Sequence, residues 1–245
     1  MLLIDIGNTR VKWAIYVDGE WSNHCVAHHQ DFTNVLSQSS LNWPNSINSA
    51  WVCNVGSDTV LNTVQNQLTK ELGISVNQAK VKRSFAGMKN DYKNLSNLGV
   101  DRWVAAIGAR SIQPSGDLIV IDVGTAVTID YVSGNNVFEG GAILPGMKLM
   151  HDSLVGHTEN ISSELSGITQ VLGKDTQECV NSGIGYGLVG GIERVINEMQ
   201  KSITTKPNLV ITGGGMQSVV ALSALNFLEE PNLVLIGLAE IANKV

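Results

Sequence analysis

The sequence predicts an α/β protein made of two related halves, in which mixed sheets are flanked by helices and a cleft lies between the two domains. Residues 2–9 and 120–126 are built alike: an apolar run ends in Asp-x-Gly, a hydroxyl residue follows, and a second β-type run comes next. The two aspartates, Asp5 and Asp122, are 117 positions apart (122 minus 5), close to half of the 245 residues. A strand–turn–strand unit repeated at this spacing indicates a duplicated domain.

The composition is that of a folded domain with a substantial core. Hydrophobic residues make up 43% of the chain and charged residues 16%, so wholesale disorder is not expected. The formal net charge of −6 argues against a general nucleic-acid surface, which would need clustered lysines and arginines. Three scattered cysteines imply no disulfide framework, and there is neither a signal-peptide pattern nor a long uncharged apolar run. We therefore expect a cytoplasmic protein without a membrane span.

The first half predicts a meander of three strands, then a fourth strand and two helices. Apolar runs predict strands over 2–6, 11–17, 21–27 and 48–55. Asp18-Gly19, between the second and third strands, is a strong signal for a short hairpin. Apolar residues at helical spacing predict a helix over 57–72, capped by Ser57 or Asp58.

After that helix, the polar segment 86–98 is expected to be a loop, and a second helix is expected from Gly99 through Arg110. Pro114-Ser115-Gly116 is the best candidate for a domain boundary. We expect an N-terminal domain of residues 1–114 and a C-terminal domain of residues 115–234, with the final segment, 235–245, packing back on the first domain.

The second half repeats the first pattern. Strands are expected over 118–122, 126–132, 137–143 and 209–212. Pro145 is well placed to start a helix, Asp175 can cap a long helix that reaches about Met199, and the last helix spans Gly237 to Asn243. The many glycines of the long helix predict tight packing, the approach of a ligand or a break. At this coarse level the arrangement resembles the ribonuclease-H-like fold that is duplicated in actin, sugar kinases and Hsp70.

The first Asp-x-Gly turn can hold the phosphates of a nucleotide. Gly7 permits close approach of the backbone, and Asn8 and Thr9 offer hydrogen bonds. Asp5 can orient Mg²⁺ through water, and the ammonium of Lys12 can neutralise phosphate charge. The alternative is an ordinary hairpin turn.

The second turn and a third glycine cluster favour the nucleotide interpretation. Gly124 and Thr125 can approach phosphates, while Asp122 can hold a cation. The cluster at 213–215 follows a strand, where a duplicated fold of this type places the adenosine. A plain strand-to-helix connection is the alternative for that cluster.

The acceptor side of the predicted site centres on Asp101 and Arg102. Asp101 falls in the first turn of the predicted helix, where the helix dipole favours a carboxylate. It is therefore either a helix-start residue or a general base that takes a proton from a substrate hydroxyl. Arg102 has the planar guanidinium that matches an anionic group such as a carboxylate.

Together these motifs resemble the type III pantothenate kinases, also called the Bvg accessory factor-like family, in sequence and in order. They are Asp5-x-Gly7-Asn8-Thr9; Tyr92 with Leu98-Gly99-x-Asp101-Arg102; Asp122-x-Gly124-Thr125-Ala126; and Gly140-Gly141-Ala142-Ile143-Leu144-Pro145-Gly146. Thr176-x-Glu178 with Ser182-Gly183 resembles the substrate-side helix of the family, so the likeness spans nearly the whole chain.

The resemblance implies ATP-dependent phosphorylation of the primary hydroxyl of pantothenate to 4′-phosphopantothenate, the first step of coenzyme A biosynthesis, with Asp101 as general base. The pantothenate side then comprises Tyr92, Gly99, Val100, Asp101, Arg102 and Thr176. The ATP side comprises Asp5, Ile6, Gly7, Asn8, Thr9, Arg10, Val11, Lys12, Gly124 and Thr125. Asp122 would hold a monovalent cation (K⁺ or NH₄⁺) and Asp5 would hold Mg²⁺ through water. The resemblance also implies a homodimer, in which Thr176 can come from the partner subunit.

Two positions depart from the family pattern. Leu95 stands where the family often has proline, and Val100 replaces the usual alanine. Neither change removes a chemical group. Two other functions stay open on the residues alone: a kinase of the same superfamily that acts on another small molecule, and a non-catalytic regulator that binds a nucleotide.

Overall fold

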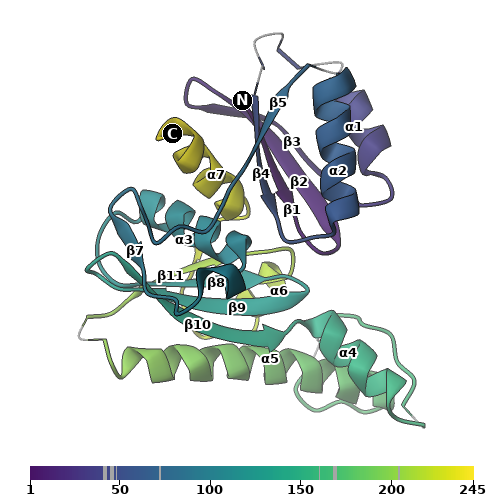
Figure 1. The fold of residues 1–245 in the computed structure, drawn as a ribbon. Coiled ribbons are helices and arrows are strands. Elements are labelled where there is room, and N and C mark those ends of the chain that lie inside the picture. Colours follow the sequence, from purple (N-terminus) through teal and green to yellow (C-terminus); the bar gives the residue numbers. More distant parts are fainter. Residues whose placement is uncertain are drawn as a thin grey trace. The chain divides into compact units, whose positions relative to one another are not determined.

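The chain folds into two units and contains two sheets, one of five strands and one of seven (Figure 1). The first unit consists of Met1–Ile112 together with Asn232–Val245, and the second of Gln113–Pro231. The computed structural model describes residues 1–40, 43–44, 47, 49–71, 73–159, 161–167, 170–203 and 205–245. Asn48 and Leu72, which end two predicted elements, lie outside the described residues. Over the described part, none of the helices combines the length and the apolar character of a membrane span.

The five-stranded sheet of the first unit confirms the predicted meander. It contains β1 (Leu2–Ile6), β2 (Arg10–Val17), β3 (Glu20–His28), β4 (Ser49–Asn54) and β5 (Ser75–Gln78), in the order β3-β2-β1-β4-β5. The first three strands are antiparallel neighbours, and β4 and β5 run parallel to β1. Asp18 and Gly19 both have positive φ, 51° and 90°, as a two-residue hairpin turn of this kind requires.

Helices α1 (Phe32–Ser40) and α2 (Asp58–Asn66) cover one face of this sheet, and α7 (Leu233–Asn243) packs on the other (Figure 1). Ser57 caps α2 as predicted, because its hydroxyl accepts a hydrogen bond from the Val60 N–H at 3.3 Å. The helix predicted over 57–72 continues beyond α2 as a π-helical turn, η1 (Gln67–Glu71), so only its last part departs from α-helical geometry. The last helix also begins earlier than predicted, at Leu233.

Strand alternation divides the side chains of β1 between the two faces. Leu2, Ile4 and Ile6 are fully buried in the cluster that includes residues of α1 and α2. Leu3 and Asp5 therefore point to the opposite face, on which α7 packs. The first aspartate of the predicted site is thus placed by the burial of its neighbours in the strand.

Helix α3 (Val100–Ile112) packs closely against α7 because two glycines face the contact. A Cβ atom on Gly108 would overlap the carbonyl of Leu233, and one on Gly237 would overlap the carbonyl of Val104. Residues 102–109 of α3 are all buried, so this helix is held rigidly from several sides.

The segment expected to be one loop over 86–98 contains regular structure, which corrects that prediction. Strands β6 (Ser84–Phe85) and β7 (Met88–Asn90) form a hairpin whose turn residues, Ala86 and Gly87, have φ of 49° and 83°. A short 3₁₀ helix, η2 (Leu95–Asn97), follows. The sequence signal was weak because alanine rarely adopts positive φ.

The second unit repeats the strand order of the first. Its strands are β8 (Leu118–Val123), β9 (Ala126–Val132), β10 (Val137–Pro145), β11 (Asn208–Thr212) and β12 (Leu228–Glu229), in the order β10-β9-β8-β11-β12. Again the first three are antiparallel and the last two run parallel to the first. Ile119, Ile121 and Val123 pack with α5, so Asp122 points to the other face, as Asp5 does in the first unit.

The helices of the second unit are α4 (Met147–Gly156), α5 (Thr176–Gln200) and α6 (Met216–Val220). Pro145 does not start α4, contrary to the prediction: it is the last residue of β10, and Gly146 occupies the cap position. Asp175 caps α5 as predicted, accepting a hydrogen bond from the Glu178 N–H at 2.8 Å. Helix α5 runs for 25 residues without a break.

Candidate active site

The first Asp-x-Gly turn is a tight loop at the end of β1. Ile6 pairs with Val11, and the Gly7 N–H donates to the Arg10 carbonyl at 3.0 Å, which closes the loop. Asn8 and Thr9 are exposed at its tip together with Arg10. The side chains of Ile6 and Val11 are fully buried, so only their backbone atoms can meet a ligand.

Asp5 has Lys12 opposite it on β2 and Cys53 opposite it on β4. Paired residues in a sheet point to the same face, so the Asp5 carboxylate and the Lys12 ammonium are neighbours there. The sequence did not predict a role for His29, which directly follows the last residue of β3. Its Nε2 lies 2.9 Å from the Gly7 carbonyl, so this side chain supports the turn. No local pattern marks this contact, because it joins residues 22 positions apart.

The second turn is one residue shorter than the first. Val123 pairs with Val127, and the Gly124 N–H donates to the Ala126 carbonyl at 3.0 Å. Thr125 lies at its tip, and its carbonyl accepts from the Gly146 N–H at 3.0 Å. A Cβ on Gly146 would overlap the carbonyl of Gly124, so the connection to α4 lies directly against the turn.

Asp122 lies among oxygen-bearing side chains. Thr128 on β9 and Thr212 on β11 are its partners in the sheet and share its face. The glycine cluster predicted at 213–215 is beside it: a Cβ on Gly213 would come within 2.5 Å of Asp122 Oδ1, and the Gly215 N–H donates to the Val123 carbonyl at 2.9 Å.

These neighbours suit a cation that prefers oxygen ligands. The two threonines were missed in the sequence, since only the sheet register brings them to Asp122. Among the described residues there is no cluster of three or more His, Cys, Asp or Glu that could hold a metal ion.

Asp101 lies in the first turn of α3, above Gly99. A Cβ on Gly99 would come within 2.5 Å of Asp101 Oδ1, so the absence of a side chain there makes room for the carboxylate. The Arg102 N–H donates to the same oxygen at 2.8 Å. Burial raises the pKa of Asp101 above the ordinary aspartate value, although the Arg102 N–H and guanidinium charge act in the opposite direction.

Arg102 is a buried cation, 7% exposed, and its guanidinium carbon lies 5.7 Å from the centroid of the Tyr92 ring. That distance is within the range of a cation–π contact. The structure therefore brings together three residues of the predicted acceptor side, Tyr92, Asp101 and Arg102, around the start of one helix.

Leu95, which departs from the family pattern, is the first residue of η2, with Asn94 as its cap. The Asn94 Oδ1 accepts from the Ser96 N–H at 3.1 Å. Proline is favoured at the first position of a helical turn because its φ is already suitable there. Leucine at this position forms the same turn, so the path of the segment toward Gly99 does not require the proline.

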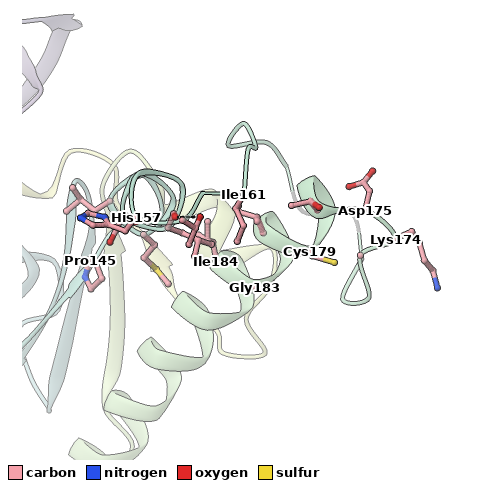
Figure 2. A pocket seen from close by; sticks show the side chains of 16 residues that line it. Pro145, His157, Ile161, Lys174, Asp175, Cys179, Gly183 and Ile184 are labelled. Atoms are coloured by element: carbon pink, nitrogen blue, oxygen red, sulfur yellow. Dashed lines mark hydrogen bonds between the residues drawn. The ribbon is translucent and has the colours of Figure 1, made fainter.

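Thr176 belongs to the second unit, where it is the exposed first residue of α5. It lines a groove of about 1130 Å³ between α4 and the start of α5, with mainly apolar walls. In Figure 2, Pro145 and His157 lie at one end of this groove, and Lys174 and Asp175 at the other.

Solved structures with a similar fold share both units. A conserved Campylobacter jejuni protein of the Baf family has a TM-score of 0.60 at 21% identity, over 99% of this chain and 98% of the other. EutJ from Carboxydothermus hydrogenoformans gives 0.54 at 8% identity, over 98% and 88%. Component A of (R)-2-hydroxyglutaryl-CoA dehydratase from Acidaminococcus fermentans gives 0.51 at 15%, over 98% and 96%. The fold is that of the actin, sugar kinase and Hsp70 superfamily, as the duplicated strand order indicates.

Sequence relatives narrow this class to one family. The family model described as type III pantothenate kinase matches residues 1–198. The type III pantothenate kinases of Verminephrobacter eiseniae and Nitrosococcus oceani are 32% and 30% identical, over 98% and 99% of this chain and 96% and 93% of theirs. The chain belongs to the type III pantothenate kinase family. It is thus an enzyme of coenzyme A biosynthesis that phosphorylates pantothenate, and the family implies ATP as the other substrate.

The contact between Gly99 and Asp101 predicts the effect of one added methyl group. In Gly99→Ala the new Cβ displaces the Asp101 carboxylate, which is a movable side chain, so the fold is retained. Because the sequence predicts Asp101 as the general base, and a misplacement of about 1 Å in an active site can cost roughly 10²-fold, we expect turnover to fall by about that factor. Thermal unfolding and steady-state turnover measure the two effects.

Gly156→Ala is the matched control, because no atom lies within 4 Å of a Cβ built there. Turnover of Gly99→Ala equal to that of Gly156→Ala would show that the position of this carboxylate is unimportant.

Proposed function

We propose that this enzyme transfers the γ-phosphoryl group of ATP to the primary hydroxyl of pantothenate, giving 4′-phosphopantothenate, with Asp101 as the general base. The setting of Asp101 carries the proposal. Its side chain is half-buried, burial raises its pKa, and it lies beside a buried arginine at the start of a helix. A carboxylate with a raised pKa is a better proton acceptor than an ordinary surface aspartate.

The reaction needs little covalent participation from the protein. The hydroxyl oxygen of pantothenate attacks the γ-phosphorus of ATP. The bond between the γ-phosphorus and the oxygen that links it to the β-phosphate breaks, ADP leaves, and the hydroxyl proton passes to Asp101. Arg102 binds the carboxylate of pantothenate through its planar guanidinium. Tyr92 and the start of α3 at Gly99 and Val100 complete this side, to which Thr176 adds a hydroxyl. Catalysis then depends on positioning and on neutralising charge.

ATP is bound, in this proposal, through the two Asp-x-Gly turns. The exposed tips at Asn8, Thr9 and Thr125 present hydroxyl, amide and backbone N–H groups of the kind that bind phosphate oxygens. Gly7 and Gly124 permit close approach at the base of each tip, and Arg10 and Lys12 add positive charge. Ile6 and Val11 contribute backbone groups only. Asp5 would hold Mg²⁺ through water, and the ion would supply positive charge for the phosphate oxygens.

Asp122 would hold a monovalent cation, K⁺ or NH₄⁺, with Thr128 and Thr212 as the neighbouring oxygen donors. Bound there, the cation would supply positive charge for the phosphates. The register of β8 with β9 and β11 supports this assignment, because it gathers a carboxylate and two hydroxyls on one face.

The chain is also proposed to form a homodimer through the second unit. Gly183, Gly187 and Gly190 recur at helical spacing on an exposed face of α5, and a Cβ on the first or the last would meet no atom within 4 Å. Tyr186 is 40% exposed on the same helix. The second unit also exposes other apolar side chains: Ile143, Leu149, Leu154, Leu165, Val171 and Leu172. Large apolar side chains left exposed on one unit support a protein–protein contact there.

Asp101→Asn tests the general base, because it keeps the shape and removes the basic group. We expect turnover to fall by about 10²–10⁴-fold, the range that general base catalysis contributes. In the wild-type enzyme kcat/KM should fall at acid pH with a midpoint above the ordinary aspartate value of about 3.9, since the base must be ionised. Asp91→Asn, in the exposed segment before Tyr92, is the control.

The same variant has a second readout that is independent of catalysis. A raised pKa means that folding disfavours the ionised form of the carboxylate. The contribution of Asp101 to the free energy of unfolding is therefore largest at low pH and is lost as pH rises through the folded-state pKa. Asp101→Asn should therefore unfold at a higher temperature than wild type at pH 7, and the gain should shrink at acid pH. Turnover within a few-fold of wild type, with this stability gain present, would exclude the base role.

Asp122→Asn tests the cation. Wild type should be activated by K⁺ in a titration at constant ionic strength, and Asp122→Asn should lose that dependence together with much of its activity, because the amide carries no charge. Asp117→Asn is the matched control near the other end of the strand. Its carboxylate accepts hydrogen bonds from Tyr131, Gly134 and Thr205, so this variant should lower the melting temperature without changing the K⁺ dependence.

If K⁺ activated Asp122→Asn as strongly as it activates wild type, the proposal that Asp122 holds the cation would be wrong.

Gly190→Leu tests the dimer. Leucine suits a helix better than glycine and meets open space in a single chain, so it should not unfold the protein. If α5 faces a second copy, the larger side chain separates the subunits, and sedimentation velocity should show monomers where wild type shows dimers. Asn62→Leu places the same apolar side chain on an exposed position of α2 and should leave the dimer intact. Dimers of both variants would place the interface elsewhere.

A further inference from the structure

The open end of the β6–β7 hairpin is held by two side chains that the catalytic proposal does not use. The Asn90 N–H donates to the Arg83 carbonyl at 2.9 Å, which extends the pairing of Ser84 with Lys89 and of Phe85 with Met88 by one more pair. The Arg83 side chain then reaches over the outgoing chain. Its Nη1 donates to the Asn90 carbonyl at 2.8 Å and to the Tyr92 carbonyl at 3.0 Å.

Asn90 holds the same segment from inside. It is 2% exposed, and its Oδ1 accepts a hydrogen bond from the Tyr92 N–H at 3.0 Å. Among the described residues its Nδ2 has no hydrogen-bond partner, so burying that group is costly. The stabilising contribution of the Asn90 side chain is therefore the hydrogen bond that its Oδ1 accepts from the Tyr92 N–H. The backbone of Tyr92 is therefore fixed at both its N–H and its carbonyl by side chains of the hairpin.

The position of this backbone decides where the Tyr92 ring lies. The ring faces the guanidinium of Arg102, 5.7 Å from its centroid, and Arg102 follows Asp101 in the first turn of α3. Helix α3 is buried along most of its length and cannot move to follow the ring. The ring must therefore be brought to Arg102 from the hairpin side, and Arg83 is the charged group that holds it there.

We propose that Arg83 is a positioning residue for pantothenate: it fixes the turn at 90–92 and so sets Tyr92 against Arg102, which binds the anionic end of the substrate. The inference rests on the proposed roles of Tyr92 and Arg102. Arginine suits the task because it stays charged and one terminal nitrogen carries two N–H donors. Hydrogen bonds from a charged donor are stronger than neutral ones, so two of them can restrain an exposed turn.

Removing the Arg83 side chain should affect one substrate and not the other. In Arg83→Ala we expect KM for pantothenate to rise about tenfold, while KM for ATP and kcat stay within about twofold, since ground-state positioning of the acceptor is what is lost. Arg83→Lys keeps the charge but ends one atom short, and should fall between Arg83→Ala and wild type. Lys89→Ala removes a positive charge from an exposed position of the same hairpin and should resemble wild type.

A double-mutant cycle separates positioning from a general effect on the fold. Arg83 acts through Tyr92, so adding Arg83→Ala to Tyr92→Ala should raise KM for pantothenate no further than Tyr92→Ala alone. Additive effects of the two substitutions would overturn the inference. So would equal changes in KM for both substrates, or a change in Lys89→Ala as large as that in Arg83→Ala.

The cycle also distinguishes two failures. If Tyr92→Ala leaves KM for pantothenate unchanged, then the proposed role of Tyr92 in the site is wrong. If Tyr92→Ala raises that KM and Arg83→Ala does not, then only the positioning role of Arg83 is wrong.

Discussion

The pleat of the two central strands is the constraint on which the rest of the structure depends. In β1, Leu2, Ile4 and Ile6 are buried among residues that include those of α1 and α2, so Asp5 has to point to the opposite face. The same alternation in β8 turns Asp122 away from α5. A shift of one residue in either register would bury the carboxylate in an apolar core, at a cost far above that of the turn itself. Burial of the neighbouring apolar residues thus determines the face of the sheet to which both aspartates point.

At the start of α3, two opposing effects, burial and the charge of a neighbouring arginine, set the pKa of Asp101. Burial raises the pKa of Asp101, while the N–H and the guanidinium of Arg102 favour its ionised form. Burial has the larger effect, so the carboxylate stays basic although a cation is adjacent to it. Gly99 makes this arrangement possible, because a side chain there would occupy the space of the carboxylate oxygen. The helix itself cannot relax, since Gly108 and Gly237 bring α3 and α7 into close contact.

Signals that are local in the sequence predicted local structure well. Ser57 and Asp175 cap their helices, and Asp18-Gly19 forms the hairpin turn. Features set by distant contacts were missed or wrong. The hairpin around Ala86 has no glycine at its first turn position, and Pro145 ends strand β10 because the pairing with β9 continues as far as Pro145, opposite Ala126. Of the candidate site, sequence identified the acids, but Thr128, Thr212, Arg83 and His29 join it only through register or long-range contacts. The boundary near Pro114 and the assigned roles of the site residues stay predictions.

The two Asp-x-Gly turns are similar in structure, but the residues across the sheet from their aspartates give them different chemistry. Across the sheet from Asp5 stands Lys12, which brings a positive charge to the same face of the sheet. Across from Asp122 stand Thr128 and Thr212, which bring oxygen atoms and no charge. In the proposed site, neutral oxygen donors beside Asp122 would suit a cation that is bound directly, whereas an ammonium opposite Asp5 would favour an ion held through water. In the proposed assignment, Mg²⁺ at Asp5 and a monovalent ion at Asp122 would differ because different residue types occupy the cross-strand positions in each half.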